Sequence, residues 1–170
     1  MGLAHCQCEP SWGELATMSY PDACVGPDDE PRLRDEHAFL ERQLAKAIVL
    51  AEADDWQGFE LRWEVFMTTL EQHLKYDETQ IFPAFAKSEG ASQLDVRRIC
   101  NEHEELRKEV RFLDALSQQP ELFIEQLRCL ARTLQAHKEK EGRMLYPWLA
   151  SLRVSQPLSH KPESAHSMRT

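Results

Sequence analysis

The chain has 170 residues, which is enough for one domain with a sizeable apolar core. Its net charge of -9 and the lack of a basic stripe argue against nucleic acid or an anionic membrane as a partner. No apolar run approaches the roughly 20 residues that cross a bilayer, and the N-terminus lacks the features of a secretory signal. The five cysteines follow no disulfide framework, so we expect a reducing, cytoplasmic compartment.

Irregular segments flank a helical region. Residues 1–30 are rich in Pro, Gly, Cys and Asp, which predicts an irregular N-terminal arm. Residues 155–170 contain two prolines and several serines, which predicts a flexible C-terminal tail. Between them, apolar residues recur with helical spacing. The predicted helices cover residues 31–54, 55–87, 92–117 and 120–153.

The short connections between these helices imply that neighbours run antiparallel. We therefore predict an all-α fold, an up-down-up-down four-helix bundle over residues 31–154. In the first helix the pattern predicts an inward face made of Leu33, His37, Leu40, Leu44, Ala47 and Val49.

Two stretches of the sequence repeat one motif. His73 is followed by Asp77 four residues later and then by an aromatic residue and Pro83; His137 is followed in the same way by Glu141 and Pro147. Positions i and i+4 share one face of a helix, so each histidine and its carboxylate point to the same place. A proline inside a helix removes a hydrogen bond, which predicts a kink or a helix end in both motifs.

Each predicted helix carries one histidine on its inward face: His37, His73, His103 and His137. A single inward histidine is more often a hydrogen-bonded core residue than a metal ligand. Four imidazoles and two carboxylates in one apolar interior would instead be costly without a counter-charge. A pair of divalent cations would remove that cost. Nitrogen and oxygen donors without thiolate favour iron or manganese, with zinc as an alternative.

On these residues the stretch 31–153 resembles the hemerythrin-like (HHE cation-binding) domain family. The resemblance implies a four-helix bundle around a non-haem di-iron centre. It also implies that the histidines complete the coordination of each iron and that the carboxylates Asp77 and Glu141 bridge the two ions.

The sequence departs from the family pattern at two positions. Asp77 stands where the family usually has Glu, and Glu78 is the alternative ligand, although it lies further round the helix. Arg107 replaces the fifth histidine of the oxygen-carrying hemerythrins, which argues against reversible oxygen carriage. The remaining set of four histidines and two carboxylates is similar to that of the iron–sulfur cluster repair proteins. Those proteins usually carry a further cysteine-containing domain, which this chain is too short to hold.

The resemblance implies a protein that meets O2, NO or peroxide, or that handles iron, in sensing, stress response or iron–sulfur cluster repair. The alternative is a di-metal oxidoreductase that acts on peroxide or O2. A third interpretation is a metal-free helical interaction module. The sequence leaves open whether the bundle forms a homodimer.

Other candidate residues carry weaker signals. Cys6 and Cys8 lie in the arm, and His160 and His166 lie in the tail, where a role in metal binding is not favoured. Glu104 and Glu105 are candidates for carboxylates that hydrogen-bond a ligand histidine from outside the metal site.

Overall fold

The computed structural model describes residues 25–26, 28–116 and 120–154. Within them the chain forms four long helices: α2 (Asp29–Glu52), α3 (Trp56–Tyr76), α5 (Gln93–Ala115) and α6 (Pro120–Val154). Two short segments, η1 (Asp77–Ile81) and α4 (Phe82–Ala86), follow α3. No helix in this described part is long and apolar enough to cross a membrane. Most of the predicted arm and all of the predicted tail lie outside the described residues.

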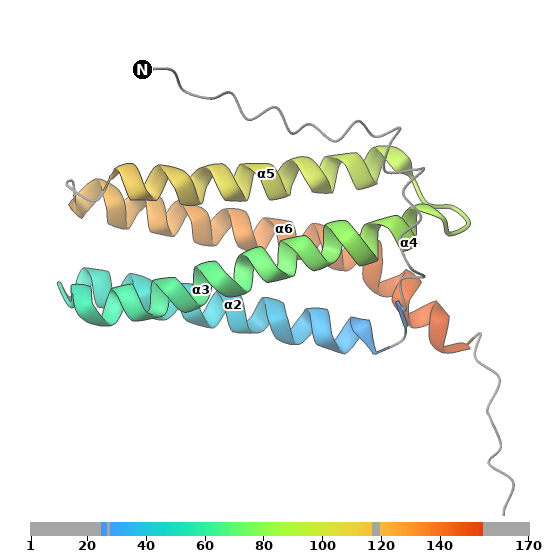
Figure 1. Cartoon of the computed structure of the whole chain (residues 1–170), viewed down its shortest axis with the longest axis horizontal. Coiled ribbons are helices and arrows are strands. Elements are labelled where there is room, and N and C mark those ends of the chain that lie inside the picture. Colours follow the sequence, from blue (N-terminus) through green and yellow to red (C-terminus); the bar gives the residue numbers. More distant parts are fainter. Residues whose placement is uncertain (1–24, 27, 117–119, 155–170) are drawn as a thin grey trace, which may run out of the picture.

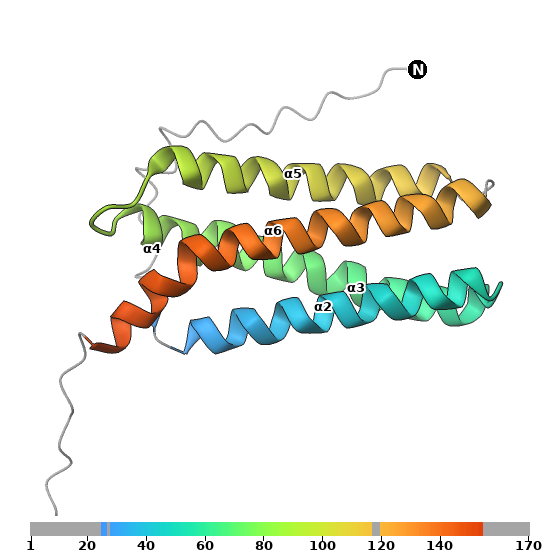
Figure 2. The same cartoon turned by 180° about the vertical axis from the view of Figure 1, so that it is seen from behind.

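Successive long helices run in opposite directions (Figure 1). Helix α2 lies against α3 and α6, and α5 lies against α6. Seen from behind, α6 crosses the molecule between α5 and α2 (Figure 2). The predicted all-α fold, an up-down-up-down four-helix bundle, is therefore confirmed.

The helix starts follow from local capping chemistry. The Asp55 side chain accepts a hydrogen bond from the Gly58 backbone N–H at the start of α3, at 2.9 Å. The Ser92 hydroxyl accepts one from the Asp95 N–H at the start of α5, at 3.2 Å. Both bonds satisfy a backbone donor that has no partner within the helix. Between α4 and α5, Gly90 has a φ of 80°, which a residue without a side chain adopts readily.

The second predicted helix is divided before its proline. Residues Asp77–Ile81 form a π-helical turn, in which the Phe82 N–H donates to the Asp77 carbonyl. Pro83 follows at the start of α4 and has no N–H to continue the regular pattern. This π-helical turn is the local distortion that we predicted from Pro83, and it begins at Asp77. Pro147 in contrast lies inside α6, whose C-terminal part bends away from the bundle axis (Figure 1).

Two apolar clusters fill the interior. The large apolar cluster consists of Leu40, Leu44, Ala47, Ala51, Phe59, Phe66, Leu70, Leu74, Leu106, Val110, Leu113, Leu116, Phe123, Leu127, Leu130 and Leu134. The small apolar cluster consists of Leu33, Ile81, Phe82, Phe85, Val96, Ile99, Leu145 and Leu149. The prediction that Val49 faces the interior is wrong, because its side chain is 62% exposed and lies on the outer face of α2.

Candidate metal centre

Six buried polar side chains separate the two apolar clusters along the helices, and we call them the polar layer. Each is at most 2% exposed. All four long helices and η1 contribute, because the polar residues follow the same inward spacing as the leucines one turn away. The polar layer consists of His37 from α2, His73 from α3, Asp77 from η1, His103 from α5, and His137 and Glu141 from α6.

The inner atoms of the polar layer converge. His37 Nε2 lies 3.0 Å from His73 Nε2 and 2.8 Å from Glu141 Oε2. His73 Nε2 lies 3.3 Å from Asp77 Oδ2. Donor atoms of His37, His73, His137 and Glu141 all lie within 4.8 Å of one another, and so do those of Asp77, His103 and Glu141. Glu141 belongs to both groups, so the six residues form one continuous donor set.

Many of these converging atoms have no hydrogen-bond partner. They are both carboxylate oxygens of Asp77, both carboxylate oxygens of Glu141, and Nε2 of His103 and of His137. The short approach between His37 and Glu141 does not have hydrogen-bond geometry. A single buried polar group without a partner costs about 1–3 kcal/mol. Cations placed among these atoms would satisfy several of them at once, so the donor set fits a metal centre.

The electrostatics of the polar layer also fit bound cations. Burial raises the pKa of Asp77 well above its usual value, and the negative charge of Glu141 raises it further. Two carboxylates this close cannot both ionise without a counter-charge. Burial lowers the pKa of His37 and of His103, so both imidazoles are neutral near pH 7 and keep a lone pair for a metal.

Three of the histidines have a carboxylate beside their outer nitrogen, Nδ1. A carboxylate there favours the tautomer with the proton on Nδ1, which leaves the Nε2 lone pair facing the interior. In each case the carboxylate comes from a neighbouring helix. The pairs are Glu36 with His73 at 3.3 Å, Glu78 with His103 at 2.9 Å, and Glu102 with His137 at 3.5 Å, the last without hydrogen-bond geometry.

Each of these carboxylates is paired in turn with a cation: Glu36 with Arg32 at 2.8 Å, Glu78 with Arg107 at 2.8 Å, and Glu102 with Lys140. The charge of the outer carboxylates is therefore balanced on the solvent side. Burial alone would raise the pKa of Glu78, but hydrogen bonds from His103 and Arg107 lower it to about 2. Glu78 is consequently ionised at neutral pH and is a strong acceptor for His103.

The fourth histidine has a different outer partner. His37 Nδ1 lies 3.1 Å from the hydroxyl of Tyr146 on α6. Burial raises the pKa of Tyr146 to about 12, and the nearby charge of Glu141 contributes. The phenol is therefore uncharged at neutral pH.

All six predicted ligand candidates lie together in the structure. Glu78, the alternative to Asp77 as a ligand, lies outside this group. Glu78 does not belong to the converging groups; it contacts His103 and Arg107. The suggestion that Glu104 or Glu105 supports a ligand histidine is wrong. Glu104 pairs with Arg107 and Glu105 with Lys108 on the exposed face of α5. Cys6, Cys8, His160 and His166 lie outside the described residues.

The outer partners Glu36, Glu102 and Tyr146 were not predicted from the sequence. Two of them were visible as a repeated dipeptide, because a glutamate directly precedes both His37 and His103. Each glutamate, however, contacts the histidine of the next helix and not its neighbour in sequence. The pattern therefore marked the glutamates without indicating which histidine they contact.

Residues 29–149 match the model of a protein family described as the hemerythrin HHE cation binding domain. The matched stretch begins at the first residue of α2, ends within α6 and contains the whole polar layer. No curated protein and no solved structure matches the chain.

Proposed function

Because the chain belongs to the hemerythrin HHE cation-binding domain family, we propose that its polar layer is a di-iron centre. The proposed ligands are His37, His73, Asp77, His103, His137 and Glu141. The observation that carries the proposal is the convergence of buried carboxylate oxygens and imidazole nitrogens that lack hydrogen-bond partners. An apolar bundle holds such a group stably when cations neutralise it.

The ring positions support two cations rather than one. The rings of His37 and His73 lie 4.5 Å apart, and those of His103 and His137 lie 4.8 Å apart. Across the layer the separations are larger, 6.2 Å from His37 to His137 and 6.4 Å from His73 to His137. Each close pair would hold one ion. His137 is assigned to the ion of His103 by its ring position, although its donor atom also lies within 4.8 Å of those of His37, His73 and Glu141. Asp77 and Glu141 would supply carboxylate oxygens that hold the ions, and Glu141 belongs to both groups of donor atoms.

The donor chemistry supports iron as the metal. Imidazole nitrogen with carboxylate oxygen and no thiolate suits iron or manganese, and zinc remains the alternative. Bound iron would supply open coordination positions and a change of oxidation state. The residues of the chain would hold the ions in place, exclude bulk water and keep the imidazoles in the metal-binding tautomer.

We infer that the protein binds O2, NO or peroxide at this centre and acts in sensing, in the response to oxidative or nitrosative stress, or in iron–sulfur cluster repair. Arg107 supports a role other than reversible oxygen carriage, because its guanidinium binds Glu71 and Glu78 and adds no ligand to the centre. We place the protein in the cytoplasm, where thiols such as those of Cys100 and Cys129 stay reduced.

The test is metal analysis combined with visible spectroscopy. Metal-free protein loaded with ferrous iron without oxygen should retain about two iron ions per chain. Exposure to air and to nitric oxide should each produce a different visible spectrum, whereas nitrogen should produce no change. Less than one ion per chain after loading would contradict the proposal. Steady-state turnover of peroxide would instead identify the centre as that of a di-metal oxidoreductase.

A matched control comes from the two repeated motifs. The double variant His73→Leu/His137→Leu places apolar side chains at both buried positions and removes one proposed ligand from each ion. It should fold and retain no iron. Retention of iron by this variant would locate the bound metal elsewhere in the chain.

A further inference from the structure

The two repeated motifs differ at two positions that face the polar layer. The residue after the carboxylate is Glu78 in the first motif and Gly142 in the second. The aromatic residue before the proline is Phe82 in the first motif and Tyr146 in the second. Both motifs therefore supply one histidine and one carboxylate as proposed ligands, with Asp77 in the first and Glu141 in the second, but the residues around these ligands differ.

These two differences act together in the second motif. If Gly142 carried a Cβ atom, that atom would lie 2.9 Å from Cε2 of Tyr146. The absence of a side chain at residue 142 lets the Tyr146 ring lie directly against α6 and brings its hydroxyl to 3.1 Å from His37 Nδ1. In the first motif Glu78 fills the equivalent place and binds His103, while the Phe82 ring packs 5.2 Å from that histidine.

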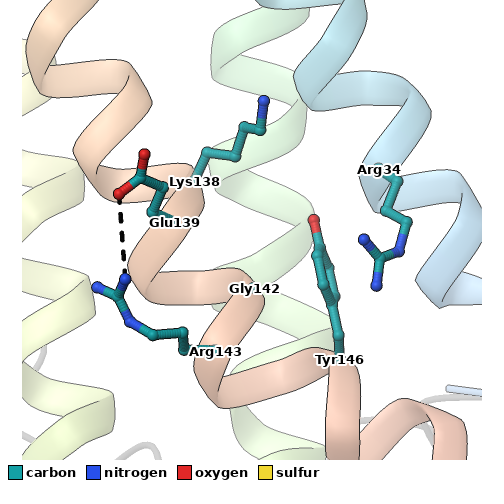
Figure 3. Close-up of a pocket in the computed structure, with 6 residues that line it drawn as sticks. All are labelled: Arg34, Lys138, Glu139, Gly142, Arg143 and Tyr146. Atoms are coloured by element: carbon teal, nitrogen blue, oxygen red, sulfur yellow. Dashed lines mark ion pairs between the residues drawn. The ribbon is translucent and has the colours of Figure 1, made fainter.

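The phenol of Tyr146 reaches from the polar layer to the surface. It lines a surface pocket of about 530 Å³ together with Arg34, Lys138, Glu139, Gly142 and Arg143. Figure 3 shows its ring between α6 and α2, with Arg34 beside it. The Arg34 guanidinium carbon lies 3.9 Å from the centre of the ring. Tyr146 therefore contacts His37 on one side and lines the surface pocket on the other.

A phenol and a carboxylate affect a metal-bound imidazole differently. A carboxylate on the outer nitrogen raises the basicity of the imidazole and strengthens its bond to the metal. A phenol is uncharged and can accept from Nδ1 or donate to it, so it raises the basicity of the imidazole less and holds the metal-binding tautomer less strictly than a carboxylate does. His103 and His137 both face carboxylates, whereas the pair of His37 and His73 has one carboxylate and one phenol.

We propose that Tyr146, seated against Gly142, is the positioning residue of His37 and makes the metal position of His37 and His73 the weaker and more readily exchanged of the two. This inference rests on the proposed di-metal centre. It adds that the two ions bind with different affinities, the weaker one at the position of His37 and His73.

The experiment titrates Co2+ into the metal-free full-length chain and follows the visible absorption of the bound ion. The wild type should bind two ions in two resolved steps. Tyr146→Phe removes only the hydroxyl and should weaken the second, weaker step by about tenfold while leaving the first step unchanged. Glu78→Gln should show the opposite pattern and weaken the first step.

Gly142→Ala separates a metal effect from a folding effect. Alanine is more favourable than glycine inside a helix, which offsets the cost of moving the Tyr146 ring, so the metal-free variant should unfold near the wild-type temperature. Its Cβ atom must displace the Tyr146 ring from His37, so the second step should nevertheless weaken as it does in Tyr146→Phe.

Tyr76→Phe is the matched control. The Tyr76 hydroxyl donates to Asp29 at 2.6 Å, and the Arg32 guanidinium carbon lies 3.7 Å from the centre of its ring. This variant removes a comparable hydroxyl that contacts no histidine, and both binding steps should stay as in the wild type.

Three outcomes separate the two proposals. Failure of the wild type to bind two ions would contradict the di-metal centre itself. Two ions bound in one unresolved step would overturn the inferred difference in affinity between the two metal positions. Two resolved steps that Tyr146→Phe leaves unchanged, or weakens equally, would overturn the role of Tyr146.

Discussion

The large apolar cluster and the polar layer are built on the same four helices, one turn apart, and are equally buried. Leu134 and His137, for example, occupy successive inward positions of α6 and are each 2% exposed. Burial of the leucine is favourable by itself because it removes apolar surface from water. Burial of the histidine leaves its inner nitrogen without a partner. The large apolar cluster therefore stabilises the bundle without any ligand, whereas the polar layer is costly to bury until a ligand satisfies its unpartnered atoms.

The largest expected effect comes from the large apolar cluster. Phe66 is fully buried there, and its ring stacks on Trp63 with the ring centres 5.2 Å apart. Phe66→Ala should lower the free energy of unfolding by about 3–5 kcal/mol, because it removes apolar contacts and leaves a cavity. Urea unfolding of the metal-free protein measures this change. A loss below about 1 kcal/mol would mean that the cluster can refill the space.

The next largest effect is expected from metal binding at the polar layer, which should stabilise the folded protein. Metal at a hundred times its dissociation constant should raise the free energy of unfolding by about 2.7 kcal/mol. His137→Leu should abolish most of this increase. The metal-free variant should be at least as stable as the metal-free wild type, because an unpartnered imidazole is replaced by an apolar side chain. Thermal unfolding with and without ferrous iron, under nitrogen, gives both values. An equal metal-induced shift in both proteins would contradict the assignment of His137.

A smaller effect is expected outside the polar layer, at Arg107. Its guanidinium pairs with Glu78 at 2.8 Å and with Glu71 at 3.1 Å. Arg107→Gln should lower the free energy of unfolding by about 1–2 kcal/mol, because the half-buried Glu78 loses a charged hydrogen-bond partner. The number of bound ions should stay the same, since Arg107 does not belong to the converging groups. Chemical unfolding and metal analysis of the same sample test both statements.

The smallest effect is expected on the outer face of the same helix. Lys108 and Glu105 form an ion pair at 2.8 Å, and both side chains are mostly exposed. Lys108→Ala should change the free energy of unfolding by no more than about 0.5 kcal/mol and should not affect metal binding. This variant is the surface control for Arg107→Gln. A larger loss would show that the exposed face of α5 contributes more than its solvent exposure implies.

The fold and the convergence of the six proposed ligands were predictable from the sequence. Apolar residues at helical spacing predicted the bundle, and the repeated motif of His73 and His137 marked the candidate ligands. The prolines predicted distortions, but not that the first would be a π-helical turn starting at Asp77. Ile81 and Phe82 within and after this turn pack in the small apolar cluster, so the form of the distortion depends on packing between helices.

The outer partners of the histidines were not predictable in the same way. Glu36 is next to His37 in the chain but contacts His73, and Glu104 is next to His103 but contacts Arg107. Adjacent residues on a helix point in different directions, so sequence proximity does not indicate these contacts. The contact between Tyr146 and His37 was also not predictable, because it depends on the space left by Gly142 and on the position of α2.

Residue spacing alone specified the four helical segments, most of their inward positions and the polar side chains at those positions. Packing between the helices set which atoms meet: the pairing of the imidazole rings, the carboxylate or phenol behind each ring, and the turn at Asp77. This division arises because the spacing of residues on one helix is a local property of the backbone. A contact between two helices depends in addition on their relative rotation and offset, which the packing of the whole interior sets.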